Sequence, residues 1–172
     1  EDAGEKAYEF MAKEHLVVAC GGDGFINIIA QKAIGCSCKM AILPFGRGND
    51  FARSLNLHTL DKAVDAIRTS NFKSVSYLNV VFSNNSRISL TNAGVGLLSE
   101  ASFRASKIPV LKGSLLYASA ALISFINLKS HRYVVTTDAQ KMEMENLILA
   151  GAASQYTGGG MYIAPDAKKF RD

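Results

Sequence analysis

Apolar runs of strand length alternate with segments of helical periodicity in the first part of the chain. His15–Cys20 and Lys39–Pro44 are short and rich in branched apolar residues, which is typical of strands buried in a parallel sheet. Between them, Phe25–Ile34 repeats apolar residues at helical spacing, and Gly35 is expected to end that helix. The apolar face predicted for this helix consists of Phe25, Ile28, Ile29 and Ala33.

Three further helices are expected in the same part of the chain: Glu5–Lys13, Asp50–Leu55 and Thr59–Thr69. Thr59 suits the N-cap position of the last helix, because its hydroxyl can accept a hydrogen bond from a free N–H group at the helix start. Strands and helices in the order β-α-β-α predict an α/β fold with parallel strands.

The pattern changes near residues 71–76, after which strand-like runs and turn residues become frequent. The strands expected there are Ser76–Phe82, Arg87–Asn92, Tyr133–Thr137, Glu143–Ala152 and Met161–Ala164, with turns at 83–86 and 138–141. Two helices, Leu97–Ser106 and Gly113–Ile126, are expected between them. We therefore predict two domains, an α/β part at residues 1–75 and a β-rich part at residues 76–172.

The composition is that of a globular chain, with 48% hydrophobic and 20% charged residues. The formal net charge of +4 suits anionic partners such as nucleotides or acidic membrane surfaces, although an ordinary solvated surface explains it more simply. The most apolar stretch, residues 113–127, is shorter than the ~20 residues that span a bilayer, so no transmembrane helix is expected. The polar, acidic start of the chain does not resemble a signal peptide.

The three cysteines, Cys20, Cys36 and Cys38, form no disulfide framework, because their number is odd and their spacing irregular. Cys20 lies in an apolar run and is expected to be a small buried residue. Cys36-Ser37-Cys38 lacks the second pair or histidine cluster that a zinc site needs. These features favour a reducing, cytoplasmic compartment.

The first candidate site is Gly21-Gly22-Asp23-Gly24, which joins a predicted strand to a predicted helix. Glycines let the backbone turn tightly and approach a ligand, and the N–H groups at a helix start attract anions such as phosphate. A carboxylate beside a phosphate is repelled unless a cation intervenes. Asp23 therefore either faces a divalent cation or caps its own turn, and an ordinary strand-to-helix turn explains the motif equally well.

The second candidate site is Leu43–Asp50, which again follows a buried strand and precedes a helix. The carboxyl ends of parallel strands share one edge of the sheet, where α/β proteins bind ligands, so the two glycine turns are expected to be neighbours. Arg47 either reaches a phosphate or is solvated at the loop tip. Asn49 either contacts a nucleotide or shapes the turn.

Two later glycine motifs, Asn92–Gly96 and Gly158–Gly160, are weaker indications, because glycines also mark bulges and bends in β structure. The three successive glycines suggest that another backbone or a ligand comes close. The apolar helix expected over 113–127 either lines a lipid pocket or belongs to the core. No nucleophile motif of serine or cysteine hydrolases, no Walker A lysine motif and no protein-kinase motif set is present.

Taken together, the motifs resemble the lipid kinase family of diacylglycerol and sphingosine kinases, which is more distantly similar to NAD kinases. The matching stretches, in the family's order, are VVACGGDGFIN, LPFGRGNDFARSLNL, NAGVG and GGGMYIAPDA. The second stretch is most similar to the diacylglycerol kinase branch. The resemblance implies an α/β nucleotide-binding domain followed by a sandwich-like lipid-binding domain, an active site in the cleft between them, and ATP and Mg²⁺ as cofactors.

In this family the first two glycine motifs hold the nucleotide. The resemblance therefore implies nucleotide binding by Gly21, Gly22, Asp23, Gly24, Phe25, Asn27, Gly46, Arg47, Gly48 and Asn49. Asp23 is the candidate catalytic residue, because it is the carboxylate inside a glycine motif. It would position the metal or the acceptor hydroxyl, or act as the base.

Two of these residues depart from the family pattern. The family usually has threonine where this chain has Phe25, although sphingosine kinases are similar in having an apolar residue there. It usually has a small hydroxyl residue in place of Arg47, whose ion pairing can replace a hydroxyl contact. Asp172 resembles the first residue of a magnesium-linked segment, and the proposed general base would lie beyond it. The chain is therefore expected to be truncated at both ends and poorly active by itself.

From the resemblance we predict that the intact protein transfers the γ-phosphate of ATP to a lipid hydroxyl, most simply that of diacylglycerol, giving phosphatidic acid. One alternative is a superfamily kinase that acts on a sphingoid lipid, ceramide or NAD. The other is a non-catalytic nucleotide- or lipid-binding module. The expected location is cytoplasmic and peripheral to membranes, with a lipid substrate at the membrane surface. No nucleic acid partner is expected, and a homodimer is left open.

Overall fold

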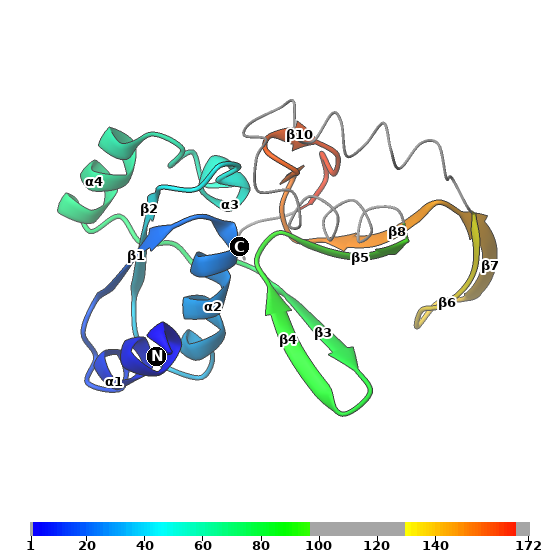
Figure 1. Ribbon diagram of the computed structural model, residues 1–172, viewed down its shortest axis with the longest axis horizontal. Coiled ribbons are helices and arrows are strands. Elements are labelled where there is room, and N and C mark those ends of the chain that lie inside the picture. The colour runs from blue at the N-terminus through cyan, green and yellow to red at the C-terminus, as the bar shows by residue number, and fades with distance from the viewer. Residues whose placement is uncertain (1, 97–129, 168–172) are drawn as a thin grey trace. The chain divides into compact units, whose positions relative to one another are not determined.

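The computed structural model describes residues 2–96 and 130–167 (Figure 1). Two compact units make up the chain, one formed by residues 1–92 and 152–172 and the other by residues 93–151. The helices predicted over 97–106 and 113–126, and Asp172, lie outside the described residues. No helix within the described ranges is both long enough and apolar enough to cross a bilayer.

The first unit is built around two parallel strands, β1 (Val17–Gly21) and β2 (Met40–Pro44). Val17 lies opposite Met40 and Gly21 opposite Pro44, so both strands end at the same edge of the sheet. The helix α2 (Asp23–Ala33) connects them and packs against β1 (Figure 1). The parallel pair with a helical connection predicted from the sequence is confirmed.

The inward face of α2 differs from the prediction. Its buried residues are Ile26, Ile29 and Ala30, whereas Phe25 and Ile28 are 38% and 51% exposed. The reason is the helix phase, because Ile26, Ile29 and Ala30 follow the i, i+3, i+4 stripe that meets the sheet. The ring of Phe25, in the first turn, lies over Gly21 instead.

The prediction that Cys20 is buried is also wrong. Successive side chains of a strand point to opposite faces. In β1 the buried side chain is that of Ala19, and Cys20 beside it is exposed.

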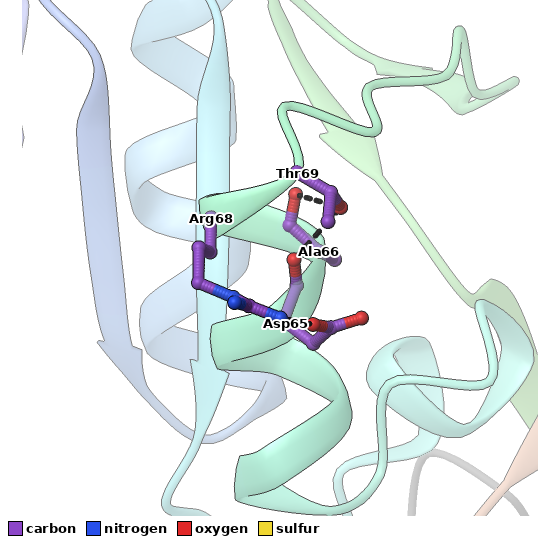
Figure 2. A network of polar contacts seen from close by, with 4 residues as sticks. All are labelled: Asp65, Ala66, Arg68 and Thr69. Atoms are coloured by element: carbon purple, nitrogen blue, oxygen red, sulfur yellow. Dashed lines mark hydrogen bonds and ion pairs between the residues drawn. The ribbon is translucent and has the colours of Figure 1, made fainter.

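Three further helices complete the α/β part: α1 (Ala3–Met11), α3 (Asp50–Ser54) and α4 (Leu60–Arg68). Thr59 is the N-cap of α4, as predicted, and its hydroxyl oxygen accepts from the Lys62 N–H. At the other end of α4, the Thr69 hydroxyl donates to the Asp65 carbonyl at 2.8 Å (Figure 2). Asp65 also pairs with Arg68 at 2.8 Å. Local polar contacts thus satisfy both ends of this short helix.

An antiparallel hairpin, β3 (Leu78–Phe82) with β4 (Asn85–Ser89), follows the helices. The predicted four-residue turn is shorter in the structure, because Phe82 pairs with Asn85 across a two-residue loop. Ser83, in that loop, has a φ of 50°, which is the left-handed conformation that tight hairpin loops require. The predicted second strand over 87–92 therefore begins two residues earlier and ends at Ser89.

The second unit is made of strands among the described residues. The strand β6 (His131–Thr136) forms an antiparallel hairpin with β7 (Lys141–Asn146), and β5 (Asn92–Gly96) pairs with β8 (Ile148–Ala152). The single strand predicted over 143–152 is thus two strands, which meet at Leu147. The glycine motif at 92–96 is part of β5, where a Cβ on Gly94 would lie 2.9 Å from the Leu149 carbonyl oxygen.

The last two strands, β9 (Tyr156–Thr157) and β10 (Met161–Tyr162), form a short antiparallel pair in the first unit. The strand predicted over 161–164 is thus two residues long. The fold class, an α/β part with a β-rich part, is confirmed. The predicted division at residue 75 stays a prediction.

Candidate functional site

The first two glycine turns touch through bare backbone. Phe45 donates its N–H to the Gly21 carbonyl at 3.1 Å, so the loop that follows β2 runs against the end of β1. A Cβ on Gly46 would lie 2.3 Å from the Cα of Gly22 and 2.7 Å from Oδ1 of Asn49. No other residue type fits at position 46 unless the two loops separate.

The Asp23 carboxylate holds the start of the helix in the second motif. Its Oδ2 accepts from the N–H of Asp50 at 3.1 Å, and its Oδ1 accepts from the N–H of Phe51 at 2.9 Å. These are N-terminal N–H groups of α3, which have no partner within the helix. Asp23 is therefore a cap, but it caps α3 rather than its own turn. Its catalytic role stays a prediction.

The Asp50 carboxylate continues this connection to the fourth motif. Asp50 is only 6% exposed, and its Oδ2 accepts from the N–H of Gly159 at 2.9 Å. Burial raises the pKa of Asp50, and the charge of Asp23 acts in the same direction. The N–H groups of Gly159 and Gly160 and the charge of Arg53 oppose this rise in pKa. Burial thus disfavours the ionised form of the Asp50 carboxylate, and the N–H groups of the glycine run partly offset this effect.

The backbone of the fourth motif explains its three glycines. Gly158, Gly159 and Gly160 have φ values of 61°, 90° and 109°. Residues that carry a side chain rarely adopt such positive φ values, and the turn formed by these glycines presents the N–H of Gly159 to the Asp50 carboxylate. The sequence suggested that a backbone or ligand comes close to these glycines, and the group that does so is a side-chain carboxylate.

Gly48 lies where the two carboxylates come together. A Cβ there would be 3.3 Å from Oδ2 of Asp23, 3.4 Å from Oδ2 of Asp50 and 3.3 Å from the Cα of Gly159. We call Asp23, Asp50 and the N–H groups that donate to them the carboxylate relay. The relay joins three glycine motifs that are far apart in the sequence.

Asp50 was not singled out from the sequence. It belongs to the second motif, but its position suited the start of a helix, which is an ordinary place for aspartate. The available indication was a carboxylate inside a glycine motif, the same indication that singled out Asp23. Only the fold brings Gly159 to it.

The other predicted residues of the second motif have distinct environments. The Asn49 amide accepts from the Gly46 N–H at 2.8 Å and donates to the carbonyls of Gly46 and Pro44 at 2.9 and 3.3 Å. Asn49, with a φ of 51°, therefore shapes its own turn. Arg47 is exposed at the loop tip, where no described residue pairs with it. Its guanidinium is available to an anion.

Asn27 connects α2 to β4. Its amide donates to the Ile88 carbonyl at 3.0 Å and accepts from the Leu90 N–H at 3.1 Å. Gln31, one helical turn further on, accepts from the Ile88 N–H at 2.8 Å. These two side chains hydrogen-bond to the strand as a neighbouring strand would. The nucleotide contact predicted for Asn27 stays a prediction.

The start of α2 remains suited to an anion. Its N-cap is Gly22, which has no side chain to occupy the first N–H groups of the helix. Gly24 is exposed, and no atom lies within 4 Å of the position a Cβ would take. Space and N–H donors thus coincide beside Asp23, as a phosphate site requires.

The described residues include a buried carboxylate oxygen without a hydrogen-bond partner among them. This oxygen is Oδ1 of Asp50. No group of three or more histidine, cysteine, aspartate or glutamate side chains gathers within the described ranges. Mg²⁺ in phosphoryl-transfer enzymes is commonly held by one or two carboxylates together with the substrate phosphates, so Asp50 fits that pattern.

Two family profiles match the chain. Residues 1–80 match the "Diacylglycerol kinase catalytic domain", and residues 91–171 match the "YegS C-terminal NAD kinase beta sandwich-like domain". The two matches together leave out little of the sequence.

Curated relatives are similar in sequence to most of this chain, and a solved structure shares its fold. The chain is 26% identical over 172 residues to a diacylglycerol kinase of Bacillus subtilis, covering 96% of this chain and 55% of that protein. It is 29% identical over 156 residues to a diacylglycerol kinase of Mycobacterium tuberculosis, covering 88% and 50%. The crystal structure of a diacylglycerol kinase from Bacillus anthracis superimposes with a TM-score of 0.69 at 24% identity, covering 97% and 55%. The chain spans about half the length of these relatives.

Proposed function

We propose a function from one premise: the chain belongs to the family of diacylglycerol kinases and related lipid kinases. The intact protein is an ATP-dependent lipid kinase that transfers the γ-phosphate to a lipid hydroxyl, with diacylglycerol as the acceptor. Residues 1–75 supply the nucleotide-binding part and residues 76–172 part of the lipid-binding region. The protein acts at the surface of cytoplasmic membranes.

The observation that carries this proposal is the carboxylate relay. Phosphoryl transfer needs little covalent chemistry from the protein, and most of the catalysis comes from positioning and charge stabilisation. The relay fixes the first, second and fourth glycine motifs against one another, so that their backbone N–H groups keep a defined geometry. Preorganised N–H donors of this kind stabilise the charge on a transferring phosphoryl group.

Specific residues take specific tasks in this proposal. The first N–H groups of α2 bind phosphate oxygens, and Arg47 adds a cation at the rim of the second turn. When bound, Mg²⁺ supplies charge neutralisation on the phosphates, and Oδ1 of Asp50 is the carboxylate oxygen placed to hold it. Asp23 keeps α3 aligned and thereby positions Asp50.

The test is an acceptor competition with the full-length protein. Mg-ATP labelled at the γ-phosphate is supplied with diacylglycerol vesicles, with NAD, and with both together. The proposal predicts label in a phospholipid and no decrease when NAD is added. Label that moves into NAD would instead establish the soluble-acceptor alternative, which the match to an NAD kinase-like sandwich favours as the second candidate.

A further inference from the structure

The first unit contains an apolar cavity whose lining includes the side chain of Phe51 but neither carboxylate of the carboxylate relay. Its volume is about 580 Å³, and it lies among residues of α2, β2, α3, α4 and β4. Pockets that take one small-molecule ligand commonly measure about 300–1,000 Å³. Among the described strands, β2 pairs only with β1, so its other edge is free to face this space.

The cavity is apolar at depth and polar at its exposed rim. All of its buried lining residues are apolar, among them Ile42, Phe51, Ile88 and Leu90. The polar side chains that line it belong to exposed positions, except for the half-buried Cys38 thiol. A ligand of matching shape has a long apolar body and one polar end.

The charges at the rim indicate which polar group the ligand would carry at its end. Lys39 and Lys73 both line the cavity, and no aspartate or glutamate is among the described residues that do so. The ammonium group of Lys39 lies 5.0 Å from the ring centroid of Phe72, another lining residue. This contact keeps the cation at the entrance, where it favours an anionic head group.

We propose that this cavity binds a long-chain fatty acid, with the hydrocarbon chain among the apolar residues and the carboxylate beside Lys39. No residue of the first two glycine turns lines the cavity, and the proposal does not depend on the proposed kinase activity. Its test therefore uses binding as the readout, and a protein without kinase activity would still answer it.

The first measurement is the affinity of saturated fatty acids that differ by two methylenes, determined by calorimetry on the full-length protein below their micellar concentrations. Burial of each methylene strengthens binding about fourfold, so each two-carbon shortening should raise Kd about fifteenfold. A Kd that does not change with chain length would overturn the proposal.

The second measurement uses matched variants on one helix. Ala66 lines the cavity from α4, while Val64 of the same helix is 48% exposed and does not line it. Ala66→Leu should reduce fatty-acid affinity at least tenfold by filling the space, and Val64→Leu should leave it unchanged. Equal Kd values for the two variants would contradict the proposal. If Ala66→Leu does not fold, Ala33→Leu fills the same cavity from α2.

A third measurement tests the head group. Lys39→Met keeps the apolar stem but removes the charge. It should weaken binding of the fatty acid by up to about fivefold and leave binding of the long-chain alcohol of equal length unchanged. Lys13→Met, at an exposed position outside the cavity, is the control. Equal losses for acid and alcohol would rule out the carboxylate contact.

Discussion

Asp50 accepts a hydrogen bond at 2.9 Å from the N–H of Gly159, a residue 109 positions further along the chain. Asp23 makes the preceding connection, since it accepts from the N–H of Asp50 itself at 3.1 Å. Two carboxylates in series therefore fix three glycine turns against one another. Because glycine turns are intrinsically pliable, these contacts define the geometry of the proposed phosphate site.

Removal of the Asp50 carboxylate should destabilise the first unit. Asp50→Ala removes the part-buried hydrogen bond between its carboxylate and the N–H of Gly159, and loss of a hydrogen bond to a charged group costs about 1–3 kcal/mol in the free energy of unfolding. Urea denaturation of the parent protein and the variant measures this loss. The control is Asp65→Ala, whose exposed pair with Arg68 should contribute less than about 1 kcal/mol (Figure 2). Equal losses for the two variants would contradict the structural role of Asp50.

The raised pKa of Asp50 predicts a pH dependence of stability. Burial is the largest cause of the raised pKa. It makes the carboxyl group of Asp50 hold its proton more tightly in the folded protein than in the unfolded chain. The resulting stabilisation is complete below the ordinary carboxyl pKa of 3.8 and is lost as pH rises through the raised folded value. The Asp50→Asn variant has no titrating carboxyl group at this position, so it serves as the reference.

The unfolding free energy of the parent protein minus that of Asp50→Asn should therefore fall as pH rises from about 3.5 to about 7. Urea titrations of both proteins across that range measure it. A difference that is constant or that rises with pH would show that burial does not dominate the titration of Asp50.

Loss of the Asp23 cap should destabilise α3 and reduce phosphoryl transfer together. Asp23→Ala removes acceptors for two N–H groups, and loss of a helix cap costs about 1–2 kcal/mol. Asp23→Asn keeps one acceptor oxygen and should be destabilised less. In the full-length protein, we expect Asp23→Asn to lower the transfer rate by orders of magnitude. A near-normal rate would remove Asp23 from the proposed machinery.

Substitution of Gly46 tests whether the first two turns form one site. Gly46→Ala places a Cβ 2.3 Å from the Cα of Gly22, so the first two turns must separate and ATP affinity should fall at least tenfold. The control is Asn79→Ala, at an exposed position in β3 outside the glycine motifs, which should leave ATP affinity unchanged. Binding of a fluorescent ATP analogue measures both variants. Comparable affinities would mean that the two turns do not form one nucleotide site.

Asn27 should stabilise the attachment of the β3–β4 hairpin. Asn27→Ala removes the hydrogen bonds to the backbone of Ile88 in β4 and of Leu90 just after it, and should lower the unfolding free energy by about 1–3 kcal/mol. Asn79→Ala, at an exposed position in β3, is the control and should have little effect. Hydrogen exchange at the amide of Leu90, which donates to Asn27, would locate the loss. Unchanged exchange there would exclude the proposed attachment.

Features set by neighbouring residues could be predicted from the sequence. The parallel strands followed from apolar runs, Thr59 followed from its place before a helix, and Gly35 adopts the left-handed φ of 82° expected where α2 ends. Each depends on interactions within a few residues. The glycine motifs were likewise recognisable, because their residue types are restricted by backbone geometry.

Features set by distant contacts could not be predicted. The partner of Asp50 is 109 residues away, and no local pattern specifies it. The inward face of α2 could be identified only once the position of the sheet was known. Ile28 and Ile29 are equally apolar, and only packing distinguishes them. Cys20 is exposed for the same reason, since an apolar run alone does not say which face of a strand is covered.

The most direct test of the central claim is transfer of labelled γ-phosphate from Mg-ATP to a panel of lipids by the full-length protein, with Gly46→Ala and the control Asn79→Ala measured in parallel. The account predicts a labelled phospholipid with the mobility of phosphatidic acid, a large loss of transfer in Gly46→Ala and near-normal transfer in Asn79→Ala. Absence of label from every lipid, with ATP binding intact, would contradict the account.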